Sequence, residues 1–283
     1  MSLRLLFIAL LFLFQSSCAT TQNRPAAVQR MYVIHCGESI ASDLSRWTTS
    51  ADAGKSILLS DHCYLIRHAK GWMLWDSGYA DRFAASMPGG FRAPGSPFLV
   101  FVRKPLVQSL QEIGVVPADI QHFALSHHHA DHSGNANLFA GATLYMQAAE
   151  HDAVFGPEPQ KYGVATANFE KLRGAKTVKL NGDHDVFGDG SVVIKSTPGH
   201  TPGHQSLFVR LPKSDPVVLS GDMVHFRANW ELKRAPSFNF SPEQSVRSMN
   251  EMEAFLKATG ARLWINHDSE QSKTIPKSPA YIE

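Results

Sequence analysis

Short apolar runs, separated by glycines and small polar clusters, dominate the hydropathy pattern of this chain. Each run is three to five residues long, a length that favours buried β-strands over helices. The expected strands are residues 31–34, 63–66, 72–75, 122–125, 142–146, 177–180, 185–187, 192–196, 206–210, 217–220 and 262–265. So many strands predict a protein built on extensive β-sheet.

Helical spacing of apolar residues interrupts these strands in a few places. It predicts helices at residues 104–113 and 148–155, a helix opening at Gly134, and one that Ser241 caps and Gly260 ends. Strands that alternate with helices place the chain in the α/β class.

A long loop is expected at residues 79–97. Loops of this length in compact domains are often lids or binding loops. Five large apolar side chains in and just after the loop would give such a lid an apolar surface: Phe83, Met87, Phe91, Phe98 and Phe101. Packing against the body of the protein is the alternative, and it is the commoner fate of aromatic residues.

Composition describes an ordinary folded protein of 283 residues, with 43% hydrophobic and 18% charged residues. The net charge of +2 and the absence of a basic stripe argue against a nucleic-acid partner. No repeat or low-complexity linker divides the chain, so we expect one domain over residues 20–283. The 14 histidines are unusual. Cys36 and Cys63 either pair, as exported proteins allow, or remain buried thiols.

The first 19 residues have the pattern of a signal peptide. Arg4 precedes an unbroken apolar run at residues 5–14, and small residues follow, which predicts cleavage before Thr20. We therefore expect an exported protein, periplasmic or secreted. A lipoprotein signal ending at Cys18 is the alternative, and only that lipid anchor would attach the protein to a membrane.

One short segment concentrates metal-binding side chains, with four histidines and one aspartate within six positions. In a turning segment His127 and His129 point to one side and His128 to the other, while Asp131 and His132 reach a second point nearby. Imidazole and carboxylate together suit zinc, and an open coordination position marks a catalytic site. An accidental cluster or a purification tag is the plain alternative, but a tag would be a longer run at a terminus.

Three further candidate ligands stand just beyond the carboxyl ends of expected strands: His200, Asp222 and His267. This is the sheet edge at which α/β enzymes collect their active sites. Two metal sites follow. One would use His127, His129 and His200, and the other Asp131, His132 and His267, with Asp222 bridging them.

Asp76 also ends a strand, in the tight turn Asp76-Ser77-Gly78. Its carboxylate either supports the metal loop from behind, as partners of ligating histidines do, or forms an ordinary Asx-turn.

These motifs resemble the metallo-β-lactamase superfamily. The resemblance is carried by the His-x-His-x-Asp-His pattern at 127–132, Thr-Pro-Gly-His-Thr-Pro-Gly-His at 197–204, Gly221-Asp222 and His267. It implies an αββα sandwich of two mixed β-sheets flanked by helices. Within the superfamily the chain is most similar to the N-acyl homoserine lactone lactonases, on the segments 63–66, 75–78, 204–207 and 267–268. That similarity makes His200 the ligand and His204 an orienting neighbour.

The activity implied is that of a quorum-quenching lactonase with two Zn²⁺ ions, which opens a small-molecule lactone by attack of a hydroxide between the metals. Asp131 or a water would protonate the leaving oxygen. Relatives carry a tyrosine shortly after the bridging aspartate, whereas this chain has Met223, Val224 and His225. Either His225 takes over as donor or acid, or that assistance is absent from this chain.

Other functions compete with this prediction. A β-lactamase is disfavoured by Asp222, because β-lactamases of this fold generally lack an acidic ligand there. Another ester or thioester hydrolase of the superfamily shares the ligands. A zinc-binding protein without turnover would use a closed site, and a flavin-coupled di-iron protein would replace a histidine of the motif with glutamate.

Overall fold

The computed structural model describes residues 28–283 and contains two β-sheets packed face to face. The larger sheet has the strand order β4-β1-β2-β3-β5-β6-β7. Its strands are β1 (Val28–Ala41), β2 (Ile57–His68), β3 (Gly71–Trp75), β4 (Phe98–Phe101), β5 (Ile120–Ala124), β6 (Thr143–Gln147) and β7 (Thr177–Leu180). Strands β4, β1, β2 and β3 pair antiparallel, and β3, β5, β6 and β7 pair parallel, so the sheet is mixed.

The smaller sheet has the order β12-β11-β10-β9-β8. Its strands are β8 (His184–Asp185), β9 (Val192–Ser196), β10 (Gln205–Val209), β11 (Val217–Leu219) and β12 (Arg262–Trp264). It too is mixed, because β11 and β12 pair parallel while the other pairs are antiparallel.

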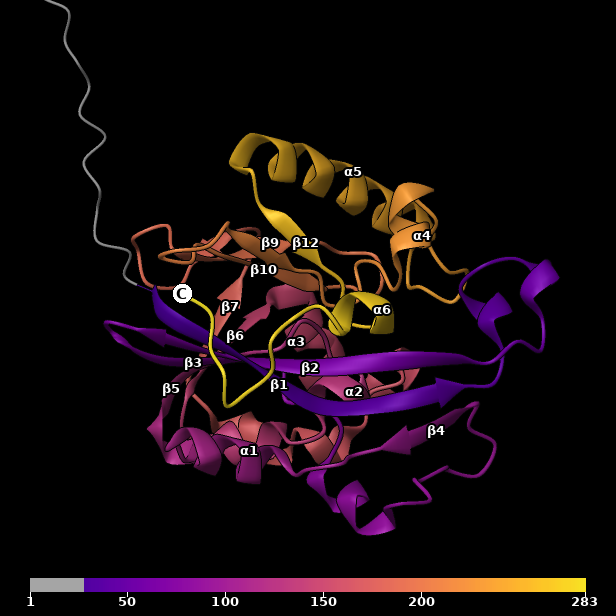
Figure 1. Cartoon of the computed structure of the whole chain (residues 1–283), viewed down its shortest axis with the longest axis horizontal. Helices are drawn as coiled ribbons and strands as arrows, with labels where there is room; N and C mark the ends of the chain where they lie inside the picture. Colours follow the sequence, from indigo (N-terminus) through magenta and orange to yellow (C-terminus); the bar gives the residue numbers. More distant parts are fainter. Residues whose placement is uncertain (1–27) are drawn as a thin grey trace, which may run out of the picture.

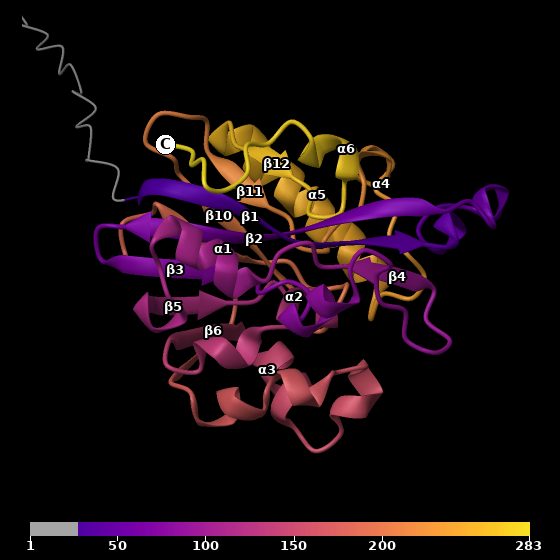
Figure 2. The same cartoon turned by 60° about the horizontal axis from the view of Figure 1, so that its bottom comes forward.

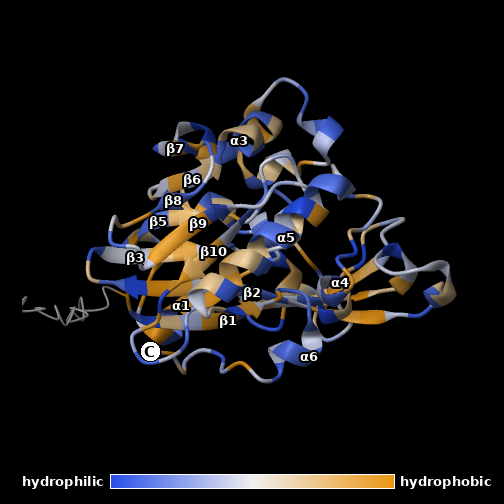
Figure 3. Cartoon of the chain, turned by 90° about the horizontal axis from the view of Figure 1, so that it is seen from above, coloured by the Kyte–Doolittle hydropathy of each residue, from blue (hydrophilic) through white to orange (hydrophobic). Residues whose placement is uncertain are grey.

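Helices cover both outer faces (Figures 1 and 2). They are α1 (Leu106–Ile113), α2 (Ala130–Ser133), α3 (Ala148–Phe155), α4 (Arg227–Glu231), α5 (Pro242–Thr259) and α6 (Ser269–Ser272). One apolar cluster fills the space between the sheets, a second joins the larger sheet to α1 and α3, and a third joins the smaller sheet to α5. Hydrophobic residues accordingly concentrate on the central strands in Figure 3. The expected αββα sandwich is confirmed.

The cap of α5 follows the sequence closely. The Ser241 hydroxyl accepts a hydrogen bond from the Gln244 amide, and Gly260 ends the helix in the left-handed conformation at φ 68°. These are the two termini at which a helix leaves backbone groups unsatisfied.

Three sequence expectations need correction. The strand expected at residues 185–187 is β8, which ends at Asp185 and not at Phe187. The Asp185 carboxylate accepts the amides of Gly188 and Gly190 and so draws the chain into a turn. The α-helix expected to open at Gly134 is not formed there: α2 ends at Ser133, and the chain continues into a short 3-10 helix at Ala136–Phe139. The Asn135 side chain donates to the carbonyls of Ser77 and Tyr79, and these long-range bonds hold a turn that the local sequence pattern does not signal.

Strands β1 and β2 are much longer than their apolar centres predict, because polar residues continue the pairing beyond them. The extension brings Cys36 and Cys63 together as a disulfide, with Cα atoms 5.8 Å apart. The question that the sequence left open is thereby answered in favour of pairing. Residues 42–56, between the two strands, form an aromatic-bearing projection at one end of the sandwich.

The outer edge of β12 is closed by a side chain. The Gln271 amide accepts a hydrogen bond from the Ile265 N–H at 2.6 Å and donates one to the Leu263 carbonyl at 2.9 Å. Gln271 thus takes the place of a neighbouring strand next to His267.

The predicted signal peptide, residues 1–19, lies outside the described residues. Among those described, no helix combines the length and apolar composition needed to cross a membrane.

Candidate active site

The seven predicted ligands come from five chain segments that meet at one end of the sandwich. His127 and His129 follow β5, Asp131 and His132 lie on α2, His200 lies between β9 and β10, Asp222 follows β11 and His267 follows β12. The structure gathers them into two adjacent groups, the same two that the sequence predicted.

The first group surrounds His129. Its Nδ1 lies 2.8 Å from His127 Nε2 and 3.0 Å from His200 Nε2. One carboxylate oxygen of Asp222, Oδ2, lies 3.3 Å from His200 Nε2 and 3.9 Å from His127 Nε2. All four ligand atoms fall within 4.8 Å of one another, as the ligands of a single cation do.

The second group takes the other oxygen of Asp222. Oδ1 lies 3.1 Å from His132 Nε2 and 3.0 Å from His267 Nε2. Asp131 Oδ2 lies 3.6 Å from His267 Nε2 and 3.9 Å from His132 Nε2. Asp222 therefore faces one group with each oxygen, which is the geometry of a bridging carboxylate.

These residues fit two divalent cations. His132 Nε2 and Asp222 Oδ1 are buried, and neither makes a hydrogen bond to any described residue, although buried polar atoms are normally paired. A cation between them would satisfy both. The donor set of imidazole and carboxylate suits zinc among the divalent metals.

A hydrogen bond through Nδ1 orients each of three imidazoles among the candidate ligands. His132 Nδ1 lies 3.0 Å from the carboxylate of Asp76, His200 Nδ1 lies 3.0 Å from Asn239 Oδ1, and His267 Nδ1 donates to the Ser60 carbonyl at 2.8 Å. Such bonds fix the tautomer and aim Nε2 at the metal. The supporting role suggested for Asp76 thus has a geometric basis.

Asp76 also accepts the Ser126 amide at 2.6 Å. The Ser126 hydroxyl in turn lies 3.1 Å from Nδ1 of both His127 and His132, so it links the two groups from behind.

His204 supports the bridge itself. Burial lowers the pKa of His204 to about 4, so the ring is neutral and its Nε2 accepts the backbone N–H of Asp222 at 2.9 Å. Its Nδ1 lies within 3.0 Å of Thr197.

Glu150, at the start of α3, is a supporting residue that the sequence analysis missed. One oxygen lies 2.9 Å from the His128 amide nitrogen and 2.6 Å from His128 Nδ1, and the other accepts from the Thr201 hydroxyl and the Gly203 amide. Burial opposes charge on both groups, but their hydrogen bond lowers the pKa of Glu150 and raises that of His128. The buried ion pair ties the two loops that carry His129 and His200.

A pocket of about 430 Å³ opens above the ligands. Phe83, Phe91 and Phe98 line it as expected, whereas Met87 and Phe101 do not. Among the lining side chains that the sequence analysis missed are Arg46, Trp47 and Phe238. Their segments, 42–56 and 232–241, carried no motif; only isolated aromatic residues in polar surroundings signalled them.

His225 is in the pocket wall as well. Its Nε2 lies 3.2 Å from Asp222 Oδ2, and its ring lies 6.0 Å from that of Trp47. The ring is therefore beside the metal ligands, as a donor to a bound substrate must be.

Comparison with known proteins places this arrangement in a family. The model of the Metallo-beta-lactamase superfamily matches residues 58–259. The chain is 31% identical to the N-acyl homoserine lactonase AttM of Azorhizobium caulinodans, over 78% of this chain and 86% of that protein. It is 33% identical to the protein of the same name from Rhizobium johnstonii, over 77% and 85%.

Solved structures of N-acyl homoserine lactone hydrolases are similar to this chain in fold. A quorum-quenching N-acyl homoserine lactone hydrolase superposes with a TM-score of 0.78 at 26% identity, covering 90% of this chain and 99% of that one. An N-acyl homoserine lactone hydrolase with N-hexanoyl-L-homoserine bound at its catalytic metal centre gives a TM-score of 0.76 at 27% identity, covering 90% and 100%.

Proposed function

This chain belongs to the metallo-beta-lactamase superfamily, and we propose that it is a two-zinc hydrolase that opens the ring of N-acyl homoserine lactones. The observation that carries the proposal is the position of Asp222, which turns one oxygen to each ligand group at the base of an aromatic pocket. Lactonases similar to this chain in sequence and structure support the choice of substrate.

Two zinc ions bound here would polarise the ester carbonyl and lower the pKa of water to near neutrality. The protein's own residues set the geometry. The bonds from Asp76, Asn239 and Ser60 hold the imidazoles before substrate arrives, so little reorganisation is needed during the reaction. The aromatic wall excludes water and takes the acyl chain.

Asp131 is suited to proton transfer. Both Asp131 and Asp222 line the pocket, but the side chain of Asp131 is partly exposed whereas that of Asp222 is buried. We assign to Asp131 the transfer of a proton from the attacking water to the leaving oxygen. To His225, whose Nε2 lies 3.2 Å from Asp222 Oδ2, we assign a hydrogen bond to the bound ester.

The test combines metal analysis with a lactone-opening assay. Ring opening releases a carboxylic acid, so the amount of base needed to hold the pH constant measures turnover. We expect about two zinc ions per chain and turnover of acyl homoserine lactones. A two-metal preparation that leaves lactones of all chain lengths intact would contradict the proposal. A chromogenic cephalosporin and a thioester run alongside identify a β-lactamase or thioesterase if either is the better substrate.

We also propose that the protein acts outside the cytoplasm, in the periplasm or after secretion. The disulfide Cys36–Cys63 supports this location, because such bonds persist in oxidising compartments. Fractionation of expressing cells, with a Cys18→Ala variant to detect lipid anchoring, tests the location.

A further inference from the structure

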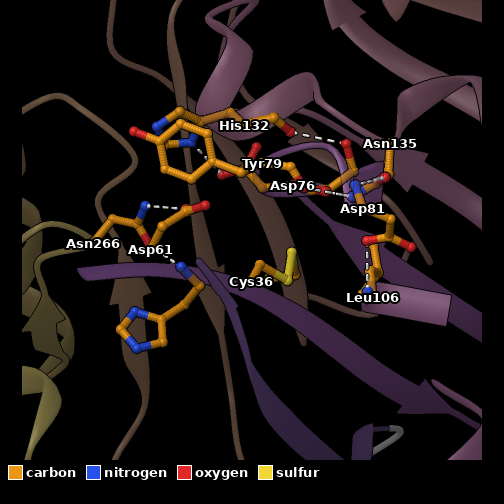
Figure 4. The surroundings of a disulfide bond; sticks show 12 residues. Cys36, Asp61, Asp76, Tyr79, Asp81, Leu106, His132, Asn135 and Asn266 are labelled. Atoms are coloured by element: carbon orange, nitrogen blue, oxygen red, sulfur yellow. Dashed lines mark hydrogen bonds and ion pairs between the residues drawn. A yellow bond between two sulfur atoms is a disulfide. The ribbon is translucent and has the colours of Figure 1, made fainter. Parts of the chain in front are cut away.

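Tyr79 is the only tyrosine among the described residues that line the pocket. It follows Asp76-Ser77-Gly78, and Figure 4 draws it together with Asp76, His132 and Asp61. Besides Tyr79, the side chains in the pocket lining that can donate a hydrogen bond, outside the candidate metal ligands, are Arg46, Trp47, Ser96 and His225. The question is therefore what chemical role the hydroxyl of Tyr79 has in this pocket.

The ring of Tyr79 is held in a slot. A register shift in β1 falls between His35 and Gly37, and the ring lies directly against Gly37. A Cβ atom built on Gly37 would stand 2.6 Å from Tyr79 Cδ2, so only glycine leaves room for the ring.

The backbone on either side is fixed to the ligand helix. The Gly78 carbonyl accepts the amide of Gly134, and the Tyr79 carbonyl accepts the side-chain amide of Asn135, at 2.7 and 2.8 Å. Tyr79 therefore keeps a set position relative to Asp131 and His132 on α2.

Tyr79 lines the pocket, and its phenol is suited to donate a hydrogen bond there. Burial and the neighbouring carboxylate of Asp131 hold the pKa of Tyr79 well above its usual value, so the hydroxyl keeps its proton. The buried Ser39 hydroxyl is a hydrogen-bond partner of the phenol. A phenol oxygen both accepts and donates, so it can accept from Ser39 and still donate its own proton to a molecule in the pocket.

We propose that Tyr79 is a further catalytic residue, whose hydroxyl donates a hydrogen bond to the leaving oxygen of the scissile ester. As the acyl C–O bond breaks, negative charge gathers on that oxygen, and the hydrogen bond stabilises it until Asp131 supplies the proton. Tyr79 keeps its own proton throughout. The inference rests on the proposed lactonase function and adds a group that the ligand set does not provide.

The first test compares leaving groups in Tyr79→Phe, which removes only the hydroxyl. An alkyl lactone leaves as a basic alkoxide, whereas an aryl lactone leaves as a stable phenolate that needs little help. We expect kcat to fall on the order of 100-fold for N-decanoyl homoserine lactone and less than about threefold for dihydrocoumarin. Tyr162→Phe, at an exposed tyrosine outside the pocket, is the matched control. Equal losses on both substrates, or no loss, would overturn the proposal.

The second test measures binding without turnover. The ring-opened product, N-decanoyl homoserine, carries the former leaving oxygen as a hydroxyl, and N-decanoyl-2-aminobutyrate lacks it. Calorimetry on the zinc-loaded wild type should show a preference of about fivefold for the hydroxyl compound, as one hydrogen bond provides. Tyr79→Phe should show none. A preference that survives the substitution refutes the role of Tyr79.

The zinc content and the unfolding midpoint of Tyr79→Phe distinguish a catalytic role from a structural one, and both should match those of the wild type. A variant that loses zinc would assign Tyr79 to the scaffold and overturn the inference. If the wild type opens no lactone, the proposed function is wrong, but the binding comparison still tests whether the Tyr79 hydroxyl donates a hydrogen bond to the ligand. A wild type that neither opens lactones nor prefers the hydroxyl compound overturns both.

Discussion

The base of the pocket and its wall are built in opposite ways. At the base, buried polar groups occupy most positions, and hydrogen bonds to Asp76, Asn239, Ser60 and Glu150 fix the ligands or the loops that carry them. In the wall, by contrast, aromatic rings pack on one another. The Trp47 ring lies 6.0 Å from Phe98 and 5.9 Å from Phe238, for example.

Burial differs as well. Trp47 is 4% exposed, but Phe238 is 45% exposed, so the outer wall has few partners to restrain it. Directional bonds tolerate little change in a side chain, whereas ring packing tolerates a change of size at modest cost. The base should therefore determine whether the reaction occurs, and the wall which acyl chain is accepted. Four substitutions test this division.

The largest effect is expected at the bridge. Asp222→Asn removes the charge that both ligand groups share, so we expect zinc content to fall below two per chain and kcat/KM to drop by about 10³-fold or more. Metal analysis and lactone assays measure the two losses. Asp215→Asn, at an exposed aspartate before β11, should leave both unchanged. Full zinc occupancy in Asp222→Asn would show that the bridge is dispensable.

A smaller loss is expected behind the ligands. Glu150→Gln leaves His128 buried without its counter-ion, which should cost about 3 kcal/mol of unfolding free energy and weaken zinc binding. Denaturant titration and competition with a chelator provide the measurements. The control is Glu158→Gln, which changes an exposed pair with Lys161. Unchanged stability would mean that the two loops hold each other without Glu150.

The third prediction concerns pH. Burial raises the pKa of Asp61, beneath the second ligand group, to about 7. In the metal-free protein the folded state then holds this proton over a pH range in which the unfolded state has lost it, so stability falls as pH rises from about 4 to about 7. Asp61→Asn removes that dependence and should be more stable than wild type by on the order of 2 kcal/mol at pH 8, but not near pH 4.

Thermal unfolding of both chelated proteins across this range is the measurement. Parallel pH curves for the two proteins would contradict the prediction. Zinc-loaded protein should show a smaller difference, because the cations stabilise the Asp61 carboxylate.

The smallest effect is expected in the wall. Phe98→Ala should lower kcat/KM for N-decanoyl homoserine lactone by about tenfold while changing that for the butanoyl compound little, since only the longer chain reaches the ring. Zinc content should not change. Leu58→Ala, at an exposed residue outside this pocket, serves as control. Equal losses on both chain lengths would show that the wall also positions the reacting ester.

The base was more predictable from sequence than the wall for a physical reason. Ligands at strand ends are signalled by local patterns, and His127, His200 and His267 each stand after an apolar run. Glu150 and Trp47 act through contacts with residues distant in sequence, for which no local pattern exists. The lengths of β1 and β2 were missed similarly, because polar residues such as Ser60 and Asp61 are buried by strand pairing and not by their own hydropathy.

The Gln271 side chain on the edge of β12 has a consequence for association between copies of the protein. An open strand edge is a template on which another chain can add, and this one lies directly before His267. The Ile265 N–H and the Leu263 carbonyl are already bonded to Gln271, so neither group is available for pairing with a strand of a second molecule. The Gln271 side chain thereby blocks strand addition at the part of this edge that leads into His267.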